Sequence, residues 1–164
     1  MKEGRMGKTY NACIKKSKGD IIKMMGMDDY FAHPDALKEI VRAFLNNPTT
    51  WWMVGTCLHD DEHKGQIWAK HVPKWNEEIY KGTNTVGGFA TISIRNKDVP
   101  EIDEDLDWMV DCDWYWRIRQ RHGLPGVIEN TNVIIGVGPH QTTDQLSMDQ
   151  KQREWKLMDE RYGK

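Results

Sequence analysis

The fold of this chain is decided by the stretch Gly19-Asp20-Ile21-Ile22-Lys23-Met24-Met25-Gly26-Met27-Asp28-Asp29-Tyr30-Phe31-Ala32-His33-Pro34. Its apolar run between Gly19 and Gly26 is short, which predicts a buried strand. Asp28 and Asp29 lie just beyond the carboxyl end of that strand, at the edge where open α/β sheets bind ligands. Adjacent carboxylates there suit a divalent cation that also holds a phosphate. The alternative is a solvated turn, because Asp is a common turn residue.

A helix is predicted to follow this turn. Pro34 fits the first helical position, and Asn46-Asn47-Pro48 provides the stop. The apolar residues between them repeat at the spacing of one helical face, which we expect to be buried: Leu37, Ile40, Val41, Phe44 and Leu45.

Length and composition restrict the class of protein. The chain has 164 residues, which we assign to a single domain, 1–164, with its own core. The net charge of −2 gives no basic surface for nucleic acid. Three scattered cysteines predict neither a disulfide framework nor a zinc site, and favour a reducing compartment. The sequence contains no apolar run long enough for a transmembrane segment, and no signal peptide. We therefore expect a cytoplasmic protein, with a peripheral position at a membrane or in a virus-infected cell as alternatives.

Helices and strands are predicted along the rest of the chain. The expected helices cover 8–18 and 109–122, with a last one beginning at the capping-box sequence 147–150. The expected strands cover 51–58, 66–72, a segment ending at 94, and two separate short segments, 126–129 and 132–137.

Other polar residues and glycines each allow a functional and a purely structural interpretation. The acidic and histidine-rich residues 59–63 could be metal ligands, but a charged hairpin tip is favoured. Gly87 and Gly88 allow close approach of backbone to a ligand, or form an ordinary turn. Asp111 lies in the first turn of a helix, where the dipole keeps a carboxylate ionised and available as a base; it is otherwise a simple helix-start acid. Eight tryptophans suit both core packing and stacking on sugars or bases.

A resemblance to a known family emerges from these motifs. The segment 11–22, Asn-Ala-Cys-Ile-Lys-Lys-Ser-Lys-Gly-Asp-Ile-Ile, followed by Asp28-Asp29, resembles the middle of a family-2 glycosyltransferase, where a helix leads into a strand that ends in an acidic DXD-type motif. Gly26 and Met27 stand where that motif usually has Asp and Ser, as in phage- and virus-type variants. The resemblance implies an α/β fold: a partial GT-A (Rossmann-like) mixed sheet flanked by helices, N-terminally truncated, because the nucleotide-binding strands would precede Met1.

The resemblance continues downstream, to about residue 147. Residues 87–95 look like the segment that crosses to the acceptor side of the family fold. Residues 111–117, Asp-Cys-Asp-Trp-Tyr-Trp-Arg, resemble the helix start "ED.D.W.R", with Asp111 at the position of the general base in inverting members. Residues 138–147 resemble a late "HE.Q.S" segment near the metal and diphosphate.

The resemblance implies metal-dependent transfer of a sugar, with inversion, from a UDP- or GDP-sugar to a hydroxyl group of a glycan or another acceptor. It implies a site of three parts. The first holds Mn²⁺ or Mg²⁺ through Asp28, Asp29 and His140, and these residues with Gly87 and Gly88 contact the donor. The second is the base, Asp111. The third contacts the acceptor through Asp113, Trp114 and Trp116, with Trp75 as a further candidate.

Two other functions remain open. The first is a non-catalytic glycosyltransferase remnant that acts as an interaction or assembly module. Loss of central strands would expose sheet edges, so a homo-oligomer is expected for such a chain. The second is a metal-dependent hydrolase built on Asp28, Asp29, Asp111 and His140.

Overall fold

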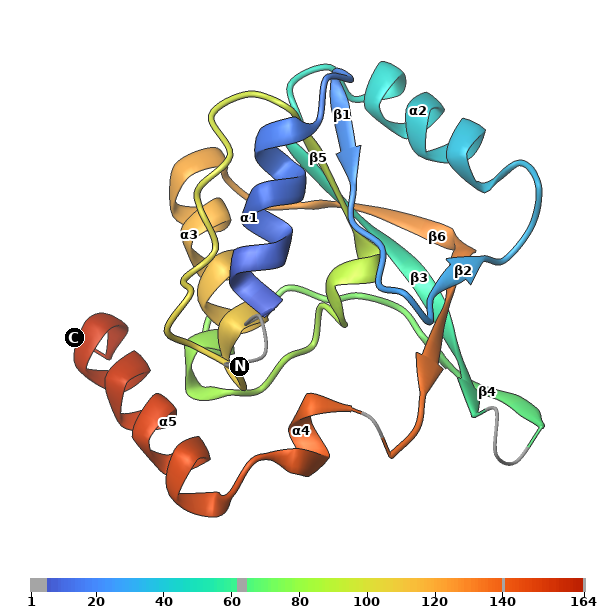
Figure 1. The fold of residues 1–164 in the computed structure, drawn as a ribbon. Helices are drawn as coiled ribbons and strands as arrows, with labels where there is room; N and C mark the ends of the chain where they lie inside the picture. The colour runs from blue at the N-terminus through green and yellow to red at the C-terminus, as the bar shows by residue number, and fades with distance from the viewer. Residues whose placement is uncertain (1–5, 62–64, 140, 164) are drawn as a thin grey trace.

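A six-stranded mixed sheet forms the centre of the structure, a computed structural model that describes residues 6–61, 65–139 and 141–163 (Figure 1). The strands are β1 (Ile21–Lys23), β2 (Tyr30–Phe31), β3 (Trp52–Asp61), β4 (Gln66–His71), β5 (Ile92–Arg95) and β6 (Gly126–Val137). Their order is β1-β5-β3-β6-β2, and β4 pairs with β3. Only β3 and β6 run parallel among these pairs.

Helices flank this sheet, as expected for the α/β class. They are α1 (Met6–Lys16), α2 (Ala36–Asn46), α3 (Val110–His122), α4 (Thr142–Gln145) and α5 (Met148–Tyr162), with 3₁₀ turns η1 (Ile79–Lys81) and η2 (Phe89–Thr91). The predicted helices over 8–18 and 109–122 are confirmed to within two residues, and the capping box of Ser147 and Gln150 is present at α5. The predicted pairing of 51–58 with 66–72 is confirmed as β3 and β4.

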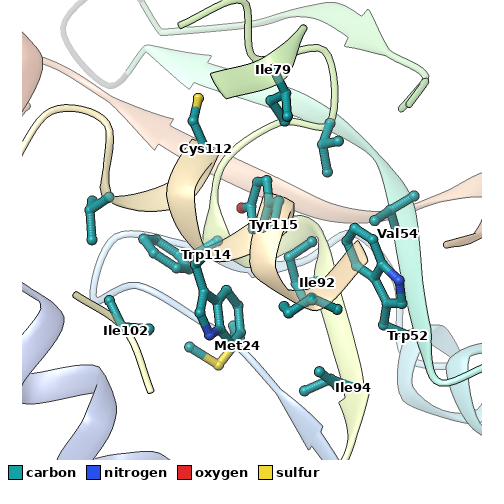
Figure 2. Close-up of a cluster of buried hydrophobic side chains, with 14 of the residues drawn as sticks. Met24, Trp52, Val54, Ile79, Ile92, Ile94, Ile102, Cys112, Trp114 and Tyr115 are labelled. Carbon is teal, nitrogen blue, oxygen red and sulfur yellow. The ribbon is translucent and has the colours of Figure 1, made fainter. Parts of the chain in front are cut away.

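The sheet separates a large core from a small one, because successive side chains of a strand point to opposite faces. Trp52 and Val54 of β3 enter the large core, which includes side chains of α3 (Figure 2). Met53, between them in sequence, packs instead against Ile40 and Phe44 of α2. The sheet therefore lies between α2 on one face and α1 and α3 on the other.

The prediction for the buried face of α2 was partly wrong. Ala36, Ile40 and Phe44, one residue per turn, are buried. The other predicted positions, Leu37, Val41 and Leu45, are exposed. A helix that covers a sheet alone buries a narrow stripe, and no second helix among the described residues packs beside α2 to cover the adjacent row.

The prediction of two separate strands at 126–129 and 132–137 was also wrong, because β6 is continuous. Its register against β3 shifts between Gly55 and Cys57, where Ile128 and Val133 are the flanking partners. The extra residues of β6 are accommodated as bulges, which bend a strand without ending it.

The helices of the described ranges are all too short or too polar to cross a lipid bilayer.

Candidate functional site

A pocket of about 620 Å³ opens at the carboxyl end of β1. Its walls come from segments that are far apart in sequence: α1, the turn after β1, η2, the start of α3, the end of β6 and the start of α4. Asp28, Asp29, Gly88 and Asp111 all line it. The structure thus brings together four of the residues that the sequence predicted for the site.

The acidic turn folds back on a glycine. The backbone N–H of Gly26 donates a hydrogen bond of 2.7 Å to Oδ2 of Asp29. A Cβ atom added at Gly26 would lie 2.6 Å from that oxygen and 3.0 Å from Oδ1 of Asp28. Both carboxylates therefore turn toward the same point, and a larger residue at position 26 would require them to shift.

Gly136 of β6 supports the same turn from the other side. A Cβ atom at Gly136 would lie 2.6 Å from the carbonyl oxygen of Asp28 and 3.0 Å from its Oδ2. Since 2.6 Å is far inside van der Waals contact and involves backbone, this close approach requires glycine.

Burial raises the pKa of Asp29, and the neighbouring carboxylate of Asp28 adds to this increase. The backbone amides of Gly26 and Gly136 and the ammonium group of Lys23 act in the opposite direction. Burial also lowers the pKa of Lys23 to about 8. The Lys23 ammonium group donates to the carbonyl oxygen of Ala90, which ties β1 to η2 behind the acidic turn.

Asp111 is fixed by two donors in the first turn of α3. Its Oδ2 accepts from Nδ2 of Asn84 at 2.6 Å, and its Oδ1 accepts from the backbone N–H of Cys112 at 2.7 Å. Burial raises the pKa of this carboxyl group, while the two hydrogen bonds oppose the increase. The result is an oriented carboxylate with a higher proton affinity than an ordinary Asp, as a general base requires.

Asn84 also shapes the glycine turn. Its Oδ1 accepts from the backbone N–H groups of Val86 and Gly87, and its Nδ2 donates to the carbonyl oxygen of Gly87 at 3.0 Å. Gly87 has a φ of +104°, and a Cβ there would lie 2.9 Å from Cγ2 of Thr91. Gly87 is therefore a residue of the turn, whereas Gly88 forms part of the pocket wall.

Glu154 of α5 holds the start of α3. This carboxylate is only 2% exposed, and it accepts from the backbone N–H groups of Asp107, Trp108 and Met109 at 3.0, 2.8 and 2.9 Å. A carboxylate is favoured at a helix N-terminus by the helix dipole and the unpaired amides. Glu154 thereby positions the segment that carries Trp108 and Asp111.

The predicted acceptor residues do not line the pocket. Asp113 is fully buried and accepts from Nε of Arg117 and the hydroxyl of Tyr162, both at 2.7 Å, so it joins α3 to α5. Trp114 is fully buried in the large core (Figure 2), where its indole N–H donates to the carbonyl oxygen of Pro100. Trp116 is half-buried and packs with a group of other aromatic rings: Trp75, Tyr80 and Tyr162. Asp113 and Trp116 lie on other sides of α3 than Asp111, because each helical residue advances by about 100°. Trp114 lies close to the side of Asp111, but it is packed into the core.

Aromatic side chains that the sequence did not assign to the site line the pocket instead. They are Tyr10, Phe89 and Trp108. Tyr10 and Phe89 have ring centroids 4.7 Å apart. Burial raises the pKa of Tyr10 to about 12, with further increases from Asp29 and Asp28.

Of the three predicted cation ligands, two lie in the part of the chain that the structure describes. Asp28 and Asp29 contribute carboxylate oxygens, and His140 lies outside the described residues, as do 62–64 of the hairpin tip. No group of three or more acidic, histidine or cysteine residues forms a cation cage within 6–61, 65–139 and 141–163. A pair of carboxylates still fits Mg²⁺ or Mn²⁺, because such ions take many of their ligands from water and substrate phosphates.

Comparison with known protein families gives no family model that matches the chain, and comparison with curated proteins gives no match.

Proposed function

We propose that this chain is a metal-dependent glycosyltransferase-type protein that transfers a sugar from a UDP- or GDP-sugar to a hydroxyl acceptor with inversion. One observation carries the proposal: a single pocket joins the paired carboxylates Asp28 and Asp29 with the separate carboxylate Asp111. The two sites need different chemistry, one for the leaving diphosphate and one for the attacking hydroxyl. A pocket of about 620 Å³ with both polar and aromatic walls suits a small-molecule substrate.

The acidic turn would hold the divalent cation. Both carboxylates turn toward Gly26, at the pocket wall. A cation bound by Asp28 and Asp29 supplies neutralisation of the charge that develops on the leaving diphosphate. Burial raises the pKa of Asp29, and the positive charge of a bound cation would act in the opposite direction.

Asp111 would act as the base. Its carboxylate takes the proton of the acceptor hydroxyl while the hydroxyl oxygen bonds to the anomeric carbon and the bond to the diphosphate breaks. Asn84 fixes the orientation of Asp111 and balances part of its charge. Tyr10 and Trp108 give the pocket apolar walls, and electrostatic interactions beside apolar walls are stronger than in open water.

The sheet supports a GT-A-type assignment in outline. It is mixed and flanked by helices, and the acidic turn follows β1. Among the described strands, β1 pairs only with β5. Its other edge is therefore open among the described strands. The same open edge favours the second candidate function, a non-catalytic interaction or assembly module, since edges of this kind readily pair with another chain.

Isothermal titration calorimetry tests the cation and donor site. We expect UDP- or GDP-sugars to bind in the presence of Mn²⁺, and EDTA to abolish this binding. Asp28→Asn combined with Asp29→Asn should abolish it as well. Asp35→Asn, which removes an exposed carboxylate at the start of α2, should leave it unchanged. A folded chain that binds no nucleotide-sugar with Mn²⁺ contradicts the transferase assignment for this chain and favours the interaction module.

A further inference from the structure

A second pocket, of about 600 Å³, lies between strands β3 and β4 and the segment that follows β6. Its lining includes two aromatic rings, two carboxylates and an amide. The polar and aromatic members are His59, Asp61, Trp68, Gln141 and Asp144. Gln141 also lines the pocket that contains Asp111, so the two pockets adjoin at this residue.

Trp68 gives the second pocket an exposed aromatic surface. Of the eight tryptophans, only Trp68 and Trp155 have large exposed surfaces, with 49% and 46% of each residue accessible. Trp155 lies on α5 and lines neither pocket. The ring of Trp68 lies 5.6 Å from that of His59, at an interplanar angle of 32°. Because Trp68 is exposed, the two rings form an accessible aromatic platform beside the pocket.

The backbone of β4 is distorted beside this platform. His59 pairs with Trp68, but Cys57 pairs with His71, so β4 carries an extra residue between the two pairs. Ala69 in this bulge has a φ of +49°, which is uncommon for a residue other than glycine. Bulges re-aim side chains, and strained backbone of this kind tends to occur at binding sites.

The same bulge fixes the ring of His59. Its Nδ1 lies 3.0 Å from the carbonyl oxygen of Ala69. A carbonyl oxygen can only accept, so Nδ1 carries the hydrogen and Nε2 is the acceptor atom of the neutral ring. His59 is therefore an oriented aromatic group with a defined acceptor, set against Trp68.

We propose that this second pocket binds a pyranose ring of the acceptor glycan. The C–H face of a pyranose is apolar and flat enough to lie on an indole ring, while its hydroxyl groups need acceptors around the rim. The exposed carboxylate of Asp144 and the amide of Gln141 provide such acceptors. The junction at Gln141 lets a glycan seated on Trp68 continue into the pocket of Asp111. This inference names the acceptor for the proposed transferase and rests on that function.

NMR of the ¹⁵N-labelled chain tests the site without any donor. The probes are methyl β-glucoside, methyl β-galactoside, methyl α-mannoside and methyl β-N-acetylglucosaminide, each titrated separately. We expect at least one of them to shift the indole N–H signal of Trp68 in a saturable manner, and to leave that of Trp155 in place. Trp68→Ala should weaken this binding by roughly tenfold or more, Trp68→Phe should retain part of it, and the control Trp155→Ala should retain all of it. The proposal is overturned if no probe shifts Trp68, or if Trp68→Ala binds as the unchanged chain does.

The failure of this inference can be distinguished from the failure of the proposed function. Pyranosides that bind at Trp68 in a chain that binds no nucleotide-sugar support the sugar site and reject the transferase. Turnover of a nucleotide-sugar with the same acceptor KM in Trp68→Ala as in the unchanged chain supports the transferase and rejects the sugar site.

Discussion

Asp111 combines its proposed role as a base with an energetic disadvantage. Its carboxyl group lies at the pocket wall in the first turn of α3, where partial burial raises its pKa. A raised pKa makes the carboxylate a better proton acceptor. It also means that folding favours the protonated form, so ionisation of Asp111 weakens the folded state. Active sites often contain residues of this kind, whose replacement stabilises the protein while it removes the activity.

The pH dependence of stability tests this property of Asp111. Below the ordinary Asp pKa, both the folded and the unfolded chain hold the proton, and burial has no ionisation penalty. As pH rises through that value, the unfolded chain ionises first, and the folded chain loses stability until the pH exceeds the raised folded pKa. We therefore expect the free energy of unfolding of Asp111→Asn, relative to the unchanged chain, to increase between acid and neutral pH.

Urea unfolding from acid to neutral pH is the measurement. Asp35→Asn, at an exposed position, serves as the control and should show no comparable increase. A difference between Asp111→Asn and the unchanged chain that stays constant or decreases with rising pH would show that burial does not raise this pKa.

Gly136 is a second residue whose identity follows from the site. The close approach of its Cα to the backbone of Asp28 holds the acidic turn against β6. We expect Gly136→Ala to displace the turn, because the new methyl group would lie 2.6 Å from the Asp28 carbonyl oxygen. Mn²⁺-dependent binding of nucleotide-sugar should then be lost or strongly weakened.

Calorimetry of Gly136→Ala measures this effect. Gly19→Ala is the matched control, since the nearest atom to a Cβ there is an oxygen at 3.5 Å, which is ordinary contact. If Gly136→Ala, once folded, binds Mn²⁺ and nucleotide-sugar as the unchanged chain does, then Gly136 is not required to hold the acidic turn in place.

Among the elements, α3 depends on α5 for its position. Glu154 of α5 accepts three backbone N–H groups before α3, and Asp113 of α3 accepts from Tyr162 of α5. A buried carboxylate that makes three charge-assisted hydrogen bonds leaves three unpaired donors when it is removed. α5 thus contributes to the site although none of its residues lines the main pocket.

Glu154→Ala should therefore destabilise the fold by about 3 kcal/mol or more. Chemical denaturation measures the loss. Glu160→Ala, which removes an exposed carboxylate from the same helix, is expected to change stability by less than about 0.5 kcal/mol. Equal effects of the two substitutions would mean that Glu154 does not anchor α3.

The elements show what local sequence can and cannot predict. Capping and stop signals gave the bounds of α1 and α3 to within two residues and the start of α5, because they act within a few positions of a helix end. The buried face of α2 was mispredicted because burial depends on which elements pack against a helix, and periodicity does not contain that information. The continuity of β6 was missed for a related reason, since its bulges exist only relative to β3.

For the molecule as a unit, the sheet order brings the site together. β5 separates β1 from β3, and β6 lies beyond β3, so strands that meet at the pocket are not successive in sequence. Local motifs identified Asp28, Asp29 and Asp111 as chemical candidates. They could not identify Asn84, Gly136 or Glu154, because an isolated Asn, Gly or Glu has no sequence signal until its partner is known. The same limit explains why the sequence named Trp114 and Trp116, which do not line the pocket, and not Tyr10, Phe89 and Trp108, which do.

The most direct test of the proposed transfer separates donor binding from turnover in Asp111→Asn. Mn²⁺ and a UDP- or GDP-sugar are incubated with the chain and with the four methyl pyranosides as acceptors, and release of nucleoside diphosphate is measured beside the calorimetric affinity. We predict that the unchanged chain turns over the donor. Asp111→Asn should bind the donor with the same affinity, but its turnover rate should be lower by roughly a hundredfold or more. Equal turnover by the two proteins, or donor binding without turnover by the unchanged chain, would contradict the assignment of Asp111 as the base of a glycosyl transfer.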